Sequence, residues 1–106
     1  MIKVIIKKRN NDILEINVSG HANSAEYGKD LVCAGISTTT VGIANALVKK
    51  HFLEGLGIID LREGFVYIKV NQFNQEIQVI LETFEIILET IEESYSQYMK
   101  ITKMEV

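Results

Sequence analysis

Alternation of apolar and polar residues marks two pairs of β-strands. Residues 1–8 are rich in β-branched side chains, which favour a strand over a helix. A polar turn follows at 9–12 and the alternation resumes over 13–19, so these segments are predicted to form a hairpin. The pattern returns in a second predicted hairpin, with strands at 58–62 and 65–70 around the tight turn Glu63–Gly64.

A period of three to four residues replaces the alternation in two longer segments. From about Asp30 to His51 the apolar residues form one stripe, which predicts an amphipathic helix. Asn74 is a typical N-cap residue, and the apolar stripe after it predicts a second helix that runs to Tyr98. The tail at 100–106 is expected to fray. The stripes are Val32, Ile36, Thr40, Ile43 and Leu47 in the first helix, and Ile77, Leu81, Phe84, Leu88, Ile91, Tyr95 and Tyr98 in the second.

The order of these elements predicts the fold class. Strand, strand, helix, strand, strand, helix with short connections indicates an α+β domain, in which a mostly antiparallel sheet carries two helices packed on one face. Residues 1–106 suffice for one hydrophobic core and not for two, so a single domain is expected. Apolar residues such as Ile5, Phe65 and Tyr67 exceed what one sheet face can bury, so we expect a homodimer that covers the other face.

Composition and charge narrow the functional classes. The chain is 47% hydrophobic and 24% charged, as ordinary globular proteins are. Its net charge of −3 argues against direct binding to nucleic acid, and no membrane-spanning run is expected. The N-terminal charges follow the apolar residues, unlike those of a secretory signal, and the single cysteine cannot form an internal disulfide. We therefore expect a cytoplasmic location.

The residues that core packing does not explain gather in one segment, 20–37, which reads GHANSAEYGKDLVCAGIS. Cys33 is expected in the first turn of the helix, with Asp30 as the N-cap, after a polar loop at about 20–30. Free backbone N–H groups and the helix dipole favour an anion there, and the thiolate is the nucleophilic form of cysteine. His21 lies twelve residues before Cys33, at the other end of the loop. The segment therefore predicts a Cys–His dyad.

Structural roles stay open for the same residues. A single cysteine near a helix start is often a small buried hydrophobe, and a histidine after Gly20 could be an exposed loop residue. His51 follows two lysines at the end of the first helix, where a cation interacts favourably with the dipole, so it is not assigned to the site. The glutamates of the second helix are interpreted as a solvated face, and neither a metal nor a cofactor is predicted.

One string in this segment resembles a known family. G-H-A, then G-x-D-x-V-C-A, then an aliphatic residue and serine is similar to the signature of the ribosomal-processing cysteine proteases, the Prp family. The resemblance implies a protease that removes a short N-terminal extension from ribosomal protein twenty-seven of the large subunit during ribosome assembly. It implies that His21 is the general base and Cys33 the nucleophile. The matching positions are Gly20, His21, Ala22, Gly28, Asp30, Val32, Cys33, Ala34, Ile36 and Ser37.

The leading hypothesis is a cysteine endopeptidase. In this hypothesis the Cys33 thiolate attacks a peptide carbonyl and water hydrolyses the acyl-enzyme. Backbone N–H groups near Cys33 and Ala34 are expected to stabilise the oxyanion, and the loop at 21–29 is expected to close over an extended peptide. The alternatives are a non-catalytic ribosome-associated adaptor or peptide-binding protein, and a redox-sensing or transferase thiol. Further candidates for binding or orienting the substrate are Gly20, Gly28, Asp30, Ala34 and Ser37.

Overall fold

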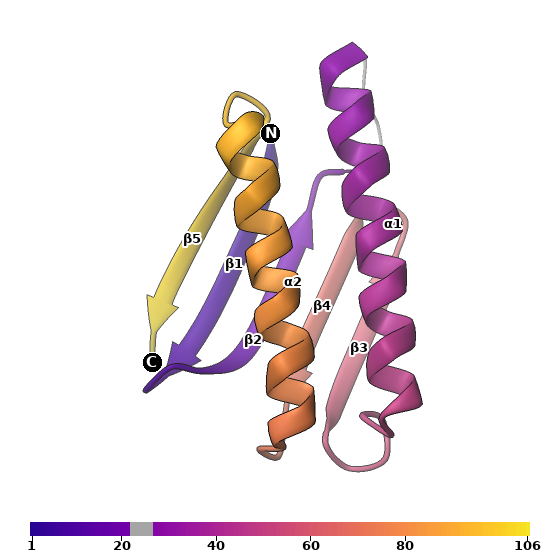
Figure 1. Cartoon of the computed structure of the whole chain (residues 1–106), viewed down its shortest axis with the longest axis vertical. Coiled ribbons are helices and arrows are strands. Elements are labelled where there is room, and N and C mark those ends of the chain that lie inside the picture. The colour runs from indigo at the N-terminus through magenta and orange to yellow at the C-terminus, as the bar shows by residue number, and fades with distance from the viewer. Residues whose placement is uncertain (22–26) are drawn as a thin grey trace.

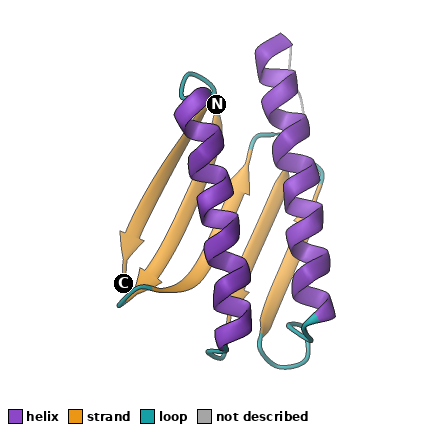
Figure 2. Ribbon diagram, in the orientation of Figure 1, coloured by secondary structure: helices purple, strands orange, loops and turns teal. Residues whose placement is uncertain are grey.

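Two helices cover one face of a five-stranded sheet (Figures 1 and 2). The computed structural model describes residues 1–21 and 27–106, and for residues 27–29 it describes the backbone alone. The predicted α+β fold, with two hairpins and a helix after each, is confirmed. The elements are β1 (Ile2–Arg9), β2 (Asp12–Ser19), α1 (Tyr27–Lys49), β3 (Gly57–Arg62), β4 (Phe65–Val70), α2 (Gln75–Ser94) and β5 (Met99–Glu105).

The sheet has the order β3-β4-β2-β1-β5, and all neighbours are antiparallel except β1 and β5. Strand β5 was missed, because the tail at 100–106 was expected to fray. It instead pairs in parallel with β1, from Ile2 opposite Met99 onward, and the Ile2 N–H donates to the Tyr98 carbonyl at 2.8 Å. The fifth strand therefore places both ends of the described chain in neighbouring strands (Figure 1).

Helix α2 begins as predicted and ends earlier. The Asn74 side chain caps it by accepting from the Ile77 N–H at 3.1 Å. The helix ends at Ser94, with Tyr95 as C-cap, so the prediction that it continues to Tyr98 is wrong. Tyr95 and Tyr98 keep the helical spacing of apolar residues because both pack against the core from the turn that leads into β5.

Helix α1 starts earlier than predicted. It begins at Tyr27, so Asp30 lies within its first turn and is not the N-cap that was predicted. Cys33 consequently lies in the second turn and not in the first. No charged residue occurs from Leu31 to Val48, and Asp30–Lys49 is long and apolar enough to cross a membrane by length and composition alone, as core helices of soluble proteins also are.

The core lies between the helices and the sheet. Most apolar strand residues that face the helices are almost fully buried, and so are most residues of the predicted stripes, whereas Ile91, Tyr95 and Tyr98 are partly buried. Gln78 connects α2 to β2 through two hydrogen bonds. Its buried amide donates to the Ile13 carbonyl and accepts from the Ile13 N–H, both at 2.8 Å. The core residues of the four antiparallel strands and of α1 include Ile2, Val4, Ile6, Ile13, Ile16, Val18, Val66, Ile68, Val32, Ile36, Ile43 and Leu47.

Candidate active site

A cavity of about 410 Å³ opens between α1 and the turn that joins β3 to β4. His21 enters it from the end of β2, and Ser37 enters it from α1, so the structure brings two of the predicted site residues together. The other lining residues come from the next turn of α1, from the end of β3 and from the turn that follows it. They are Thr40, Val41, Leu61, Arg62, Glu63 and Gly64.

Gly20 directs His21 into this cavity. Its φ is +91°, a region that side chains rarely adopt, and a Cβ there would lie 3.0 Å from the Met1 carbonyl oxygen. The Gly20 N–H donates to the Gly64 carbonyl at 3.0 Å, which fixes the end of β2 to the β3–β4 turn. Glycine is favoured here for a backbone reason, since it lets the chain bend and carry His21 inward.

The His21 imidazole is 3% exposed, contrary to the alternative that it is a solvated loop residue. Burial lowers its pKa from the ordinary value of 6.5, because the charged ring would lose its hydration. The ring is therefore neutral near pH 7 and able to accept a proton. Its Nδ1 atom has no hydrogen-bond partner among the described residues. Such a buried, uncompensated nitrogen is costly for stability and points to a functional use.

Cys33, Ser37 and Thr40 share one face of α1, since they are spaced by four and then three residues. Cys33 is 6% exposed and belongs to the core cluster, on the side of α1 that packs on the sheet. Ser37 is half-buried at the cavity wall, and Thr40 is 2% exposed. The nucleophile candidate therefore lies one turn before a residue that lines the same cavity as His21.

The remaining predicted site residues lie at or near the start of α1. Asp30 and Ala34 are exposed, and Gly28 belongs to the first turn. Cys33 and Ala34 lie beyond that turn, where backbone N–H groups of a helix usually bond within it, and their part in an oxyanion hole stays a prediction. Of the predicted lid at 21–29, residues 22–26 lie outside the described part of the chain, and 27–29 are helical.

Sequence reasoning missed Thr40 and the β3–β4 turn as parts of the site. Thr40 could have been found, because it continues the face of Cys33 and Ser37 by one more turn. The turn gives no such signal, since it reaches the cavity only through the pairing of β2 with β4. His51 lies outside the site, just after the end of α1, with its Nδ1 2.7 Å from the Glu54 carboxylate.

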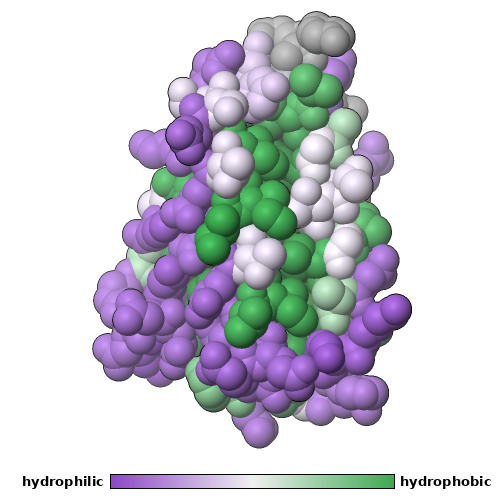
Figure 3. All heavy atoms as spheres, viewed as in Figure 1, coloured by the Kyte–Doolittle hydropathy of each residue, from purple (hydrophilic) through white to green (hydrophobic). Residues whose placement is uncertain are grey.

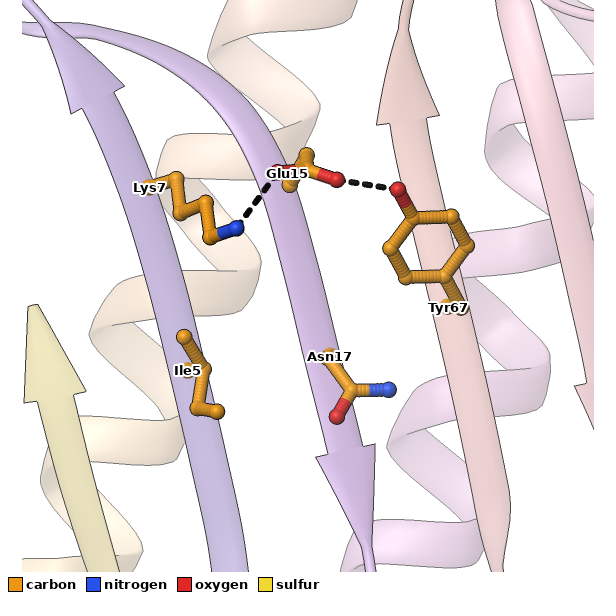
Figure 4. Close-up of a pocket in the computed structure, with 5 residues that line it drawn as sticks. All are labelled: Ile5, Lys7, Glu15, Asn17 and Tyr67. Carbon is orange, nitrogen blue, oxygen red and sulfur yellow. Dashed lines mark hydrogen bonds and ion pairs between the residues drawn. The ribbon is translucent and has the colours of Figure 1, made fainter. Parts of the chain in front are cut away.

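No cluster of three His, Cys, Asp or Glu side chains that could hold a metal occurs within residues 1–21 and 27–106. A second cavity, of about 300 Å³, lies on the opposite face of the sheet, away from the helices. There the Glu15 carboxylate accepts from the Tyr67 hydroxyl and pairs with the Lys7 ammonium at 3.3 Å (Figure 4). These bonds lower the pKa of Glu15, chiefly through Tyr67, so this cavity holds no proton acceptor comparable to His21.

Comparisons with known proteins show the family of the chain. The family model of the cysteine protease Prp matches residues 1–100. The ribosomal processing cysteine protease Prp of Bacillus subtilis (strain 168) is 33% identical over 108 residues, which cover 96% of each chain. A crystal structure of the essential ribosomal processing protease Prp from S. aureus with a substrate peptide matches with a TM-score of 0.83 at 31% identity, over 97% of this chain and 99% of that one. A second structure of the S. aureus protease, with a covalently linked product peptide, has a TM-score of 0.78 at 33% identity over the same shares.

Proposed function

Because the chain belongs to the Prp family of cysteine proteases, we propose that His21 and Cys33 form its catalytic dyad. The neutral His21 imidazole takes the proton from the Cys33 thiol, and the sulfur attacks the carbonyl carbon of the scissile peptide bond. The resulting imidazolium returns the proton to the leaving amine. A water molecule then gives its proton to His21 and hydrolyses the thioester, which releases the product and restores the thiol.

The burial of His21 in a cavity shared with Ser37 is the observation that carries this proposal. Buried polar atoms usually have a hydrogen-bond partner, whereas Nδ1 of His21 has none in the described ranges. Ser37 lies one turn after Cys33 on the same helix face, within reach of a peptide that enters the cavity. No cofactor is required, because thiol and imidazole supply both the nucleophile and the base.

The proposed substrate is the N-terminal extension of ribosomal protein twenty-seven of the large subunit, removed in the cytoplasm. Relatives are named ribosomal processing proteases, and one of them was crystallised with a substrate peptide. The cavity suits an extended chain, since it is open and has mixed polar and apolar walls. In the competing adaptor hypothesis the same cavity holds the peptide without cleaving it.

We place a homodimer interface on the exposed side of α1. Leu31, Val41 and Val48 are about half exposed there, on a helix without charged residues between positions 31 and 48. Figure 3 shows the band of hydrophobic residues along the helix layer. Gly42 also lies on the exposed side, and a Cβ there would meet nothing within 4 Å, so a second helix can approach closely. The outer face of the sheet, which was expected to be the apolar one, is mostly charged and polar.

Cleavage of the extended N-terminal peptide, followed by mass spectrometry, tests the proposal. Wild type should cut one bond, and Cys33→Ala and His21→Ala should lose at least about 100-fold in rate. His51→Ala is the matched control, because His51 is the other histidine of the chain and lies outside the cavity. Binding of the peptide by folded, reduced wild type without cleavage would support the adaptor hypothesis instead.

A further inference from the structure

Thr40 carries a second buried polar atom without a partner in the described chain. Its Oγ1 is shielded from solvent, as is Nδ1 of His21, and both residues line the same cavity. The helical threonines of α2 behave differently. The Thr83 hydroxyl donates to the Val79 carbonyl at 2.7 Å and the Thr90 hydroxyl to the Ile86 carbonyl at 2.8 Å. A threonine in a helix normally makes this bond, so the unbonded hydroxyl of Thr40 serves another group.

We propose that Thr40 is a positioning residue, whose Oγ1 accepts a hydrogen bond from Nδ1–H of His21 in the active enzyme; the two atoms line the same cavity and are not bonded to each other in this structure. This inference rests on the proposed dyad. With the proton on Nδ1, the lone pair of the imidazole lies on Nε2 and can accept the thiol proton of Cys33. The bond would give both buried atoms a partner. Thr40 acts in this arrangement through the tautomer and orientation of the base.

Two substitutions separate this role from packing. Thr40→Val keeps the shape and removes the hydroxyl, and Thr40→Ser keeps the hydroxyl and removes a methyl group. Thr40→Val should lower kcat by about 10-fold or more with KM nearly unchanged, and Thr40→Ser should recover most of the loss. Thr83→Val is the control, since its exposed hydroxyl bonds only to its own helix.

Nitrogen NMR of the His21 ring gives a readout that does not need activity. Wild type should show the proton on Nδ1, and Thr40→Val should shift the ring toward the other tautomer or a mixture. Full activity and an unchanged tautomer in Thr40→Val would overturn the assignment. If His21→Ala cleaves normally, the dyad is wrong, but a tautomer change in Thr40→Val would still report the contact between Thr40 and His21.

An independent observation concerns the sheet face that the helices leave open. Strand register places six cations and three carboxylates on this face, a net charge of +3 on a chain whose total is −3. Glu15 is paired with Lys7 and Asp60 with Arg62, and the third carboxylate, Asp12, is opposite Arg9 in the register. The cations are Lys3, Lys7, Arg9, Arg62, Lys69 and Lys100.

Two of the remaining lysines lie side by side. Lys3 is opposite Lys100 in the β1–β5 register, and neither has an ion pair in the described ranges. Like charges in opposite positions repel, which a bound anion would relieve. Phe65 and Tyr67 are half-buried on the same face, two residues apart on β4. A sheet face with lysines around aromatic rings fits single-stranded RNA, whose phosphates pair with the cations. The Arg62 guanidinium lies over the Phe65 ring, 4.3 Å from its centroid, so Tyr67 is the ring on which a base would stack.

We propose that this face binds single-stranded RNA. The net charge of the chain argued against binding to nucleic acid, but the strand register separates the charges between the two sides of the sheet. A second copy of the chain would bring like charges together, so the helix side suits the dimer and the sheet side suits a polyanion. Ile5 and Tyr67 line a shallow cavity on this face, where an unstacked base can lie (Figure 4).

Fluorescence anisotropy of a labelled RNA of about 20 nucleotides tests this face. Binding at low salt should weaken with added salt, and the double variant Lys3→Glu, Lys100→Glu should weaken it at least about 10-fold. The charge-matched control is Lys49→Glu, Lys50→Glu at the end of α1. Equal loss in both double variants, no binding at low salt, or equal binding to anionic lipid vesicles would each overturn the proposal. Peptide cleavage should not change in either double variant.

Discussion

Replacing Gly20 by alanine tests how the backbone sets the active site. The φ of +91° is strained for any side chain, at a cost of about 1–3 kcal/mol. The new Cβ would also lie 3.0 Å from the Met1 carbonyl oxygen, so β1 or the end of β2 must shift. We expect the free energy of unfolding to fall by about 2–3 kcal/mol, which lowers Tm by roughly 8–20 °C.

The same shift moves His21, the next residue, so the substitution should also change the rate of peptide cleavage. A displacement near 1 Å can cost about 100-fold in rate, so peptide cleavage should fall by at least about 10-fold. Gly55→Ala is the first control, because Gly55 has a φ of +94° with open space around it. This variant should lose stability through backbone strain and keep its cleavage rate. Gly35→Ala is the second, since a helical glycine in open space should gain about 0.5–1 kcal/mol.

Urea unfolding measured by circular dichroism, together with the cleavage rate, decides the outcome. Gly20→Ala should be the least stable and the least active of the three variants. Stability equal to that of Gly55→Ala combined with wild-type cleavage would refute the idea that Gly20 is needed to direct His21 into the cavity.

Three further predictions concern buried polar groups. Gln78→Ala should lose about 2–4 kcal/mol in urea unfolding, because both backbone groups of Ile13 lose their partner. Stability of the wild type should fall as pH drops through 6.5, since burial lowers the pKa of His21 and the unfolded chain binds the proton more tightly; thermal unfolding of His21→Gln should show a flatter pH profile. Glu85→Ala should destabilise the protein by about 1–3 kcal/mol in thermal unfolding, because the Lys8 ammonium loses the buried carboxylate whose oxygen lies 2.9 Å from its nitrogen. Full stability in this variant would contradict a stabilising role of that ion pair.

Periodicity in the sequence predicted most of the fold. Each hairpin has strong alternation and a turn at a fixed place, and each helix has a stripe that is buried in the structure. Strand β5 could not be predicted in this way, because its pairing with β1 joins opposite ends of the chain and its outer residues are mostly polar. Tyr95 and Tyr98 continue the helical spacing of apolar residues although they lie after the helix, so the end of α2 could not be predicted from this spacing.

The sequence names two candidate reactive residues, which stay a prediction, and it misses the residues that surround them in the structure. His21 and Cys33 were recognised from their residue types and from the family signature, while the start of α1 at Tyr27 moved Asp30 and Cys33 along the helix. The role of Gly20 depends on a φ value and a contact with Met1, which no sequence pattern displays. The walls of the cavity come from separate elements, so they can be identified only once the three-dimensional fold is known.

The rate at which iodoacetamide alkylates Cys33 in the folded protein at pH 7 tests the central claim most directly, because it needs no substrate. If His21 activates the thiol, wild type and His51→Ala should react rapidly, and His21→Ala should react at least about 10-fold more slowly. Equal rates in wild type and His21→Ala, or a thiol that reacts only after unfolding, would contradict the proposed dyad.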